Sequence, residues 1–459
     1  MNCPCVVSPS PGRATLHTMS TVEASPTRLR VTRPVLAWAL WDAGSAAINA
    51  VMTTFVFTVY LTSSLFGDKD SNASALASGM AVTGVAIAVS APVLGRRADA
   101  GGRRKLWLAV HTGVIIVATA ACFLVRPEHA YLWLGIVLLC VATLAAELAS
   151  VNYFAMLPQI SAKETMGRVS GFGWSFGYLG GIVALALVLF LFVQPLFEWF
   201  GASDTDGLNL RLVAVFCAVW TLAFCLPVFF AVPEVPARPG AKVSWLASYR
   251  ELFAHIGRLW RTDRTTLWFL VSSAVYRDGL AAVFTFGGVI AGAVFGMSQA
   301  QVIVFAIAGN VIAALGALTG GRLDDRVGPR AVILACLAGL LVAGFGVFFS
   351  PGVAGFWVFG LLLCLLVGPA QSASRSLLAR RTTPENAGEI FGLYTTTGRA
   401  ISFLAPALFA AGTAIAKAAG VSSAGEDGGA ATRYGILGIM VVLAAGLLLF
   451  LFTRERRTA

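Results

Sequence analysis

The sequence predicts an all-α membrane protein with twelve transmembrane helices in two six-helix bundles. Of its 459 residues, 58% are hydrophobic and only 12% are charged, whereas about 25% of the residues in a soluble domain are charged. Many apolar runs reach the length of about 20 residues that a helix needs to cross a bilayer. The two halves of the chain also carry similar motifs at corresponding places, which favours two related bundles.

The expected spans fall into two sets of six. In the first half they cover residues 35–66, 74–96, 106–125, 131–157, 168–194 and 209–231. In the second half they cover residues 266–294, 299–321, 330–349, 354–379, 388–413 and 431–452.

These spans divide the chain into an N-terminal bundle at 35–231 and a C-terminal bundle at 266–452. Polar tails are expected at 1–34 and 453–459, and a linker at 232–265. Within the linker, WLASYRELFAHIGRLW has apolar residues at helical spacing. Such a segment is predicted to lie along the membrane surface.

The distribution of positive charge predicts the orientation. Of the 33 Lys and Arg residues, 25 lie in the two tails and the alternate loops next to them, and five lie in the other loops. Cytoplasmic loops carry the excess of Lys and Arg, so both termini are expected in the cytoplasm. Because these residues are spread over many short loops, the net charge of +11 does not indicate nucleic-acid binding.

Two loops repeat each other between the halves. The first, between spans 2 and 3, reads GRRADAGGRRK, and the second, between spans 8 and 9, reads GRLDDRVGPR. One offset aligns Gly95 with Gly321, Asp99 with Asp325, Gly102 with Gly328 and Arg104 with Arg330. This pattern resembles the loop signature of the major facilitator superfamily, in which two bundles rock about a central site.

The chemistry of these loops suits a gate. Glycines permit a tight turn, and the aspartate can pair with arginines or cap a helix N-terminus of the other bundle. The alternative is a charged turn that only fixes topology. The predicted gating residues are Gly95, Asp99, Gly102, Arg103, Arg104, Gly321, Asp325, Arg326, Gly328 and Arg330.

Carboxylates also occur inside the first span of each half. Asp42 lies in LWDAGSAAINAV, and Asp278 lies in VYRDGLAAVFTFGG, beside Arg277. An ionisable group in a span costs about 2.5–3.5 kcal/mol and persists where it faces a cavity or a partner. Both aspartates lie near the predicted cytoplasmic ends, which favours a contact between bundles. A proton or substrate site is the alternative.

Glu147 lies deeper, near the middle of the fourth span. Burial among apolar residues favours the protonated form of a carboxyl group, which suits reversible proton exchange; a structural hydrogen bond is the alternative. Arg375 could be the counter-ion of a carboxylate. Other polar residues could line the same cavity or bond between helices: Asn49, Asn152, Tyr153, Asn310, Gln371 and Arg399.

Four passages together resemble a narrower family. They are residues 37–61, 147–181, 276–291 and 371–394, in both halves of the chain. They are similar to the autophagy-related vacuole effluxer family and its bacterial relatives. The resemblance implies transport and associates the chain with efflux of neutral amino acids such as leucine. The short, Arg-rich loops favour a bacterial plasma membrane.

Enzyme chemistry is not expected. The sequence contains no GxxxxGK[ST] loop for ATP, and its four histidines lack metal-ligand spacing. We therefore predict no cofactor and no metal. The expected partners are membrane lipid, a small-molecule substrate and protons, with no nucleic acid, and the chain is expected to act as a monomer.

The leading hypothesis is a secondary active transporter that exports amino acids in exchange for protons. Glu147 is the first choice for the proton-exchanging group and Asp42 the second. Multidrug or other small-molecule efflux is one alternative. A membrane receptor or assembly partner without transport is another.

Overall fold

The computed structural model describes residues 31–193, 207–234, 245–383, 385–421 and 429–453. All regular elements in these ranges are helical. They include twelve segments long and apolar enough to cross a membrane, so the predicted fold class is confirmed. The predicted tails lie almost entirely outside the described residues.

The first bundle comprises six membrane-length segments. The first combines α1 (Arg33–Ala47), a π-helix (Ile48–Phe55) and α2 (Phe57–Leu61). The others centre on α3 (Lys69–Gly101), α4 (Arg104–Ala121), α5 (Leu132–Ala155), α7 (Met166–Val188) and α8 (Leu208–Ala231). Short elements flank them: α6 (Leu157–Ile160), a π-turn at Leu189–Val193, and 3-10 turns at Ser64–Phe66, Cys122–Leu124, His129–Tyr131 and Lys163–Thr165.

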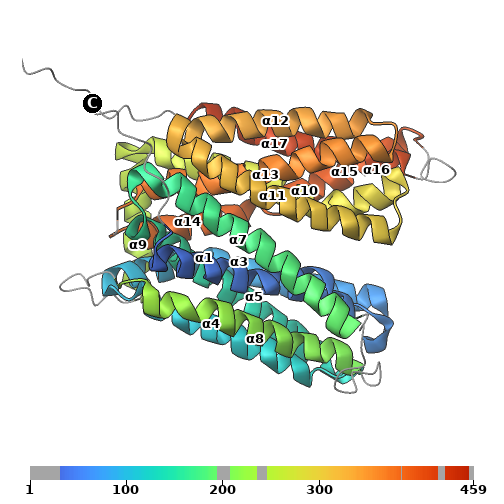
Figure 1. Ribbon diagram of the computed structural model, residues 1–459, viewed down its shortest axis with the longest axis horizontal. Helices are drawn as coiled ribbons and strands as arrows, with labels where there is room; N and C mark the ends of the chain where they lie inside the picture. Colours follow the sequence, from blue (N-terminus) through green and yellow to red (C-terminus); the bar gives the residue numbers. More distant parts are fainter. Residues whose placement is uncertain (1–30, 194–206, 235–244, 384, 422–428, 454–459) are drawn as a thin grey trace, which may run out of the picture.

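The linker helix α9 (Trp245–Thr262) precedes the second bundle. That bundle consists of α10 (Arg264–Phe295), α11 (Gln299–Val327), α12 (Pro329–Phe349), α13 (Val353–Arg381), α14 (Ala387–Ile401) with α15 (Leu404–Ala418), and α16 (Ala430–Arg433) with α17 (Gly435–Leu451). Figure 1 shows the two bundles as separate groups of ribbons, blue to green and yellow to red.

The predicted ends of two spans are wrong, and the error matters for the gates. The second span was expected to end at residue 96, but α3 continues to Gly101; α11 continues to Val327 instead of ending at 321. Gly95 and Gly321 therefore lie in helices and not in loops. The turns are made at Gly102 (φ 58°) and Gly328 (φ 87°), where a positive φ favours glycine.

Several predicted spans are not continuous α-helices, and two of them matter here. A π-helix follows α1, and a break at residues 402–403 separates α14 from α15. At this break the Asp278 carboxylate accepts a hydrogen bond from the backbone N–H of Ala405 (2.7 Å). Asp278 thus satisfies an N–H group that the start of α15 leaves without an intrahelical partner.

Helix α9 lies against α3 at one end of the molecule (Figure 1). The Tyr249 hydroxyl donates to the carbonyl of Val89 (3.2 Å), and Leu252 is buried. Phe253 and Trp260 are exposed. The helix predicted in the linker is therefore present, with an apolar residue buried against the protein and aromatic residues outside it.

The bundles meet mainly through five helices. Helix α3 packs along α14, and α7 packs along α11 and α13. At the other end, α2 and α15 have their main contacts within their own bundles. The ribbons of the two bundles lie close together near α9 and further apart at the opposite end (Figure 1).

Candidate functional site

Asp99, in the last turn of α3, joins the first bundle to the second. Its carboxylate accepts hydrogen bonds from the backbone N–H groups of Gly388 (3.1 Å) and Glu389 (2.9 Å) in the first turn of α14. These N–H groups have no partner within their own helix, and the helix dipole favours negative charge there. The contact is therefore an N-terminal cap provided by the other bundle.

Arg104 holds this carboxylate in place. Its Nε donates to Asp99 (2.7 Å) and its Nη1 donates to the carbonyl of Ala155 (3.3 Å). Only 1% of the Arg104 surface is exposed, so the ion pair is buried. Arg103, which was also predicted to act in the gate, is exposed, and the structure does not bring it to this contact.

Asp325 makes the corresponding contact in the opposite direction. It accepts from the backbone N–H groups of Gly167 (2.8 Å) and Arg168 (3.2 Å) in the first turn of α7. It also forms ion pairs with the Arg168 side chain (3.2 Å) and with Arg380 (3.0 Å). Each bundle thus caps a helix of the other with an aspartate.

Two further predicted gating arginines lie elsewhere. Arg326 is exposed. Arg330 donates to the carbonyl of Leu451 (3.2 Å) and lies 5.9 Å from the centre of the Phe450 ring. The structure therefore places Arg330 against α17 of its own bundle.

Sequence reasoning missed two partners in the second gate, Asp324 and Arg380. Asp324 is 1% exposed, pairs with Arg380 (3.0 Å) and accepts a hydrogen bond from Ser376. A signal for the helices that meet the gates was present in the sequence. The segments MGRVSG at 166–171 and AGEIFG at 387–392 have glycines at the same spacing in corresponding places of the two halves.

A second set of contacts lies further along the interface, around Arg375 of α13. Its Nη1 lies 3.5 Å from the Asp42 carboxylate of α1. Its Nε donates to the Ser170 hydroxyl (3.0 Å) and its Nη2 to the Ser170 carbonyl (2.6 Å). The Tyr153 hydroxyl donates to the same Asp42 oxygen (3.1 Å). Arg375 therefore connects the second bundle to three helices of the first.

Aromatic rings enclose this guanidinium. The rings of four residues of the first bundle have centres 4.7–5.7 Å from its central carbon: Trp38, Tyr153, Phe154 and Trp174. Such rings attract a cation through their negative faces. With 1% of Arg375 exposed, the cation is shielded from solvent. The roles of Trp38, Ser170 and Trp174 were not predicted.

Glu147 of α5 forms an ion pair with Arg399 of α14. About a third of each side chain is exposed, 32% for Glu147 and 31% for Arg399. The expectation that Glu147 is buried among apolar residues is therefore wrong, because the side chain is accessible and faces an arginine. The pair is the most accessible ionic contact between the bundles among the described residues.

The remaining predicted polar residues lie in different surroundings. Three bond within their own helices: Asn49 accepts from Thr53, Asn152 donates to Leu148, and Asn310 donates to Ala306. Gln371 is partly buried on α13. Arg277 donates to the backbone carbonyl of Tyr394 (3.3 Å), and its guanidinium carbon lies 3.8 Å from the centre of the Tyr394 ring. Asp278 caps α15 and is not brought to Asp42.

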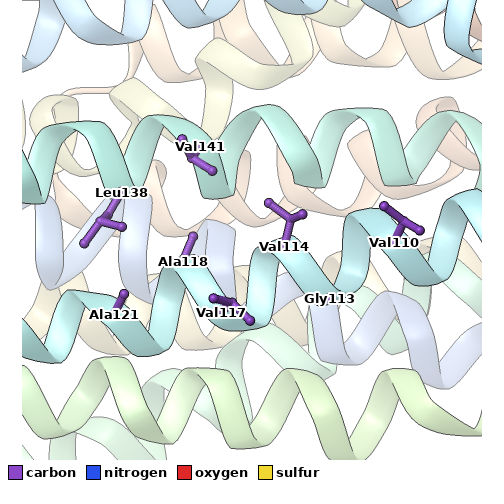
Figure 2. Close-up of a pocket in the computed structure, with 8 residues that line it drawn as sticks. All are labelled: Val110, Gly113, Val114, Val117, Ala118, Ala121, Leu138 and Val141. Atoms are coloured by element: carbon purple, nitrogen blue, oxygen red, sulfur yellow. The ribbon is translucent and has the colours of Figure 1, made fainter.

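The two cavities described lie away from the bundle interface. One is an open groove of about 470 Å³ between α4 and α5. Figure 2 shows that its lining side chains are aliphatic, without polar atoms. A second cavity of about 50 Å³ lies inside the second bundle. Neither offers groups that could bind a polar solute.

Metal binding finds no support in the described ranges. There, no three His, Cys, Asp or Glu side chains gather as metal ligands would. The cysteines described are unpaired, and five of the six are buried.

Known proteins resemble the chain in sequence. An uncharacterized transporter of the major facilitator superfamily type from Bacillus subtilis (strain 168), YxiO, is 24% identical over 83% of this chain and 88% of its own. Autophagy-related protein 22 of Cryptococcus neoformans is 24% identical over 53% of this chain and 47% of its own. A probable nitrate/nitrite transporter of Mycobacterium tuberculosis, NarK2, is 25% identical over 52% of this chain and 57% of its own.

Solved structures share the fold. The proton:xylose symporter XylE has a TM-score of 0.69 at 13% identity, over 92% of this chain and 96% of its own. The transporter FucP in the outward conformation has a TM-score of 0.69 at 15% identity, over 92% of this chain and 99% of its own.

The sequence profile described as vacuole effluxer Atg22 like matches residues 62–457, most of both bundles. The chain therefore belongs to the vacuole effluxer Atg22-like family of major facilitator superfamily transporters.

Proposed function

We propose that the protein exports amino acids in exchange for protons by alternating access. The observation that carries this proposal is the pair of reciprocal caps, Asp99 on α14 and Asp325 on α7. They hold the bundles together at one end only. Releasing two carboxylate caps and their arginines would let this end open while the other end closes, as rocking bundles require.

The closed end is the end that positive charge assigns to the cytoplasm. On this proposal both termini are cytoplasmic, the membrane is a bacterial plasma membrane and the described conformation faces outward. The structural similarity to FucP in its outward conformation supports this assignment. We further propose that the chain works as a monomer, since each bundle caps a helix of the other within one chain.

Glu147 is the proposed proton carrier and Asp42 the second choice. Both carboxylates pair with arginines of the opposite bundle, Arg399 and Arg375. Protonation would remove the negative charge and weaken the contact between bundles. Glu147 is the better candidate because a third of its side chain is exposed, whereas 19% of the Asp42 side chain is exposed beside a fully buried arginine.

Uptake of a mixed labelled amino-acid pool into proteoliposomes tests the proposal, with and without an imposed pH gradient. We expect particular amino acids to accumulate only with the gradient. Glu147→Gln should lose this accumulation but retain exchange of unlabelled for labelled amino acid at equal pH. The control is Glu164→Gln, because Glu164 is an exposed glutamate in the 3-10 turn before α7.

Two outcomes would count against the proposal. Intact pH-driven transport by Glu147→Gln would remove Glu147 as the carrier. Failure of the folded protein to move any amino acid would favour multidrug or other small-molecule efflux, and failure to move any solute would favour a receptor or assembly role.

A further inference from the structure

Away from the two gates, the charged side chains that the structure describes at the bundle interface are divided by sign. The carboxylates, Asp42 and Glu147, belong to the first bundle, whereas Arg277, Arg375 and Arg399 belong to the second. Two of the arginines form ion pairs across the interface, Arg375 with Asp42 and Arg399 with Glu147. In the described part of the chain, Arg277 is the member of this set without an ion-pair partner.

Arg277 has no carboxylate partner among the residues that the structure describes. Its polar contact there is with the carbonyl of Tyr394, and its guanidinium carbon lies 3.8 Å from the centre of the ring of the same residue. The adjacent carboxylate, Asp278, is used by the N-terminus of α15. A guanidinium has five N–H donors, so most of its donors remain for another group.

The position of Arg277 on α10 directs it toward the first bundle. With 3.6 residues per turn, residues 277, 281, 284 and 288 share one face of the helix. On this face the ring of Phe284 lies 5.9 Å from the ring of Tyr178 in α7. Arg277 is partly exposed and Ala281 is exposed, so this face is accessible next to the contact between bundles.

Arg277 also lies near the backbone that carries Arg399. A Cβ atom on Gly398 would be 3.4 Å from the Arg277 Nη1 atom, and Gly398 directly precedes Arg399 in α14. Among the described residues away from the gates, Arg277 is thus a guanidinium without an ion-pair partner, next to the helix segment whose Arg399 forms an ion pair that is about one-third exposed.

We propose that Arg277 binds the anionic group of the transported solute, a planar oxyanion such as a carboxylate. An unneutralised charge within a membrane span is costly, and a guanidinium forms two parallel hydrogen bonds with a carboxylate. The inference rests on the proposed transport function and adds that the solute must carry an oxyanion. An amino acid carries one, and nitrate shares its planar geometry.

Exchange of labelled leucine in proteoliposomes at equal pH provides the first test, because it needs no proton gradient. We expect unlabelled leucine and 4-methylpentanoate, which keeps the carboxylate but lacks the amine, to compete. Leucinamide, which lacks the carboxylate, should not compete. Equal competition by leucinamide would overturn the inference while leaving amino-acid transport intact.

Arg277→Gln tests the residue itself. We expect the half-saturating leucine concentration to rise about 10- to 100-fold, the effect of losing a hydrogen bond to a charged group, which corresponds to about 1.4–2.8 kcal/mol. Arg277→Lys should raise this concentration less, since lysine keeps the positive charge. Arg211→Gln is a matched control: Arg211 also donates to a carbonyl, that of Phe123 (2.6 Å), and lies 4.6 Å from the centre of that ring.

Ligand-induced thermal stabilisation of the purified protein separates this inference from the proposed function. Leucine, 4-methylpentanoate and sodium nitrate are each added to the unmodified protein, to Arg277→Lys and to Arg277→Gln. Stabilisation by nitrate alone that depends on Arg277 would support the anion site and contradict amino-acid export. Stabilisation by none of the three, or equal stabilisation of Arg277→Gln, would overturn the inference.

Discussion

Gly95 of α3 and Gly388 of α14 lie against each other without room for a side chain. A Cβ atom on Gly95 would be 2.1 Å from the carbonyl oxygen of Gly388. The contact brings the two backbones close enough for Asp99, one helical turn after Gly95, to reach the N–H groups at the start of α14. The glycine contact therefore sets the distance that the cap requires.

Gly95→Ala should weaken closure of the gated end. The added methyl group must push the helices apart, and overpacking of this kind costs about 1–3 kcal/mol. Because the cost falls only on the closed conformation, the ratio of open to closed molecules should rise by about 5- to 160-fold. Spin labels at Arg103 and Arg326, both exposed near the gates, would report a longer distance between bundles.

Gly84→Ala is the control for this experiment. Gly84 lies on the same helix, but a Cβ atom there would meet nothing within 4 Å. Alanine favours a helix over glycine by about 1 kcal/mol, so this variant should be at least as stable as the original. Equal opening in both variants would show that the Gly95 contact does not control closure.

Asp99→Ala should destabilise the protein more than removal of the whole Asp99–Arg104 ion pair. The single change leaves Arg104 charged, buried and without its carboxylate, and breaking a buried pair in this way costs about 3–5 kcal/mol. The double variant Asp99→Ala with Arg104→Ala removes the stranded charge. We therefore expect its thermal unfolding temperature to lie above that of Asp99→Ala.

Asp70→Ala serves as the comparison, since Asp70 lies at the other end of α3 and is exposed. It should leave both unfolding and the distance between the spin labels unchanged. If Asp99→Ala is as stable as Asp70→Ala, the buried pair does not hold the closed end.

Arg375→Lys should not behave as a conservative substitution. Two nitrogens of the guanidinium donate to Ser170 while a third faces Asp42, and a single ammonium cannot reproduce this planar arrangement. Losing one or two hydrogen bonds from a charged group costs about 1.5–3 kcal/mol each. Exchange at equal pH should become slower, and the thermal unfolding temperature should fall.

Lys105→Arg is the reverse substitution at a partly buried lysine outside this cluster. It should leave exchange at equal pH and the thermal unfolding temperature unchanged. Normal exchange and unfolding of Arg375→Lys would mean that the charge alone, and not the planar geometry, holds the bundles at this position.

The parts of the fold that the sequence predicts are those governed by local pattern. The lengths of the apolar runs locate the twelve spans. The repeated motif locates Asp99 and Asp325, because glycine turns and charged residues can be recognised within a segment of about ten residues. The exact helix ends were less predictable. Charged residues can continue a helix beyond the apolar run, as residues 97–101 do in α3.

The arrangement at the interface could not be read in the same way. Asp42 and Arg375 are 333 residues apart, and their pairing depends on how α1 and α13 are rotated within their bundles. The ion pair of Glu147 with Arg399 has the same origin. Hydrophobic pattern indicates which helices span the membrane but leaves the rotation of each uncertain when most of its surface is apolar.

The linker helix α9 adds a weak ion pair to the first gate, and the free energy that this ion pair contributes can be predicted from its solvent exposure. Arg96 of α3 pairs with Glu251 of α9 and lies 3.6 Å from Glu389 of α14; 48% of the Glu251 side chain is exposed. Exposed ion pairs contribute about 0.2–1 kcal/mol. Glu251→Gln should therefore raise the ratio of open to closed molecules less than about fivefold, with a smaller effect in high salt, as measured by the same spin-label distances. Opening by Glu251→Gln as large as that expected for Gly95→Ala would instead make α9 a principal part of the gate.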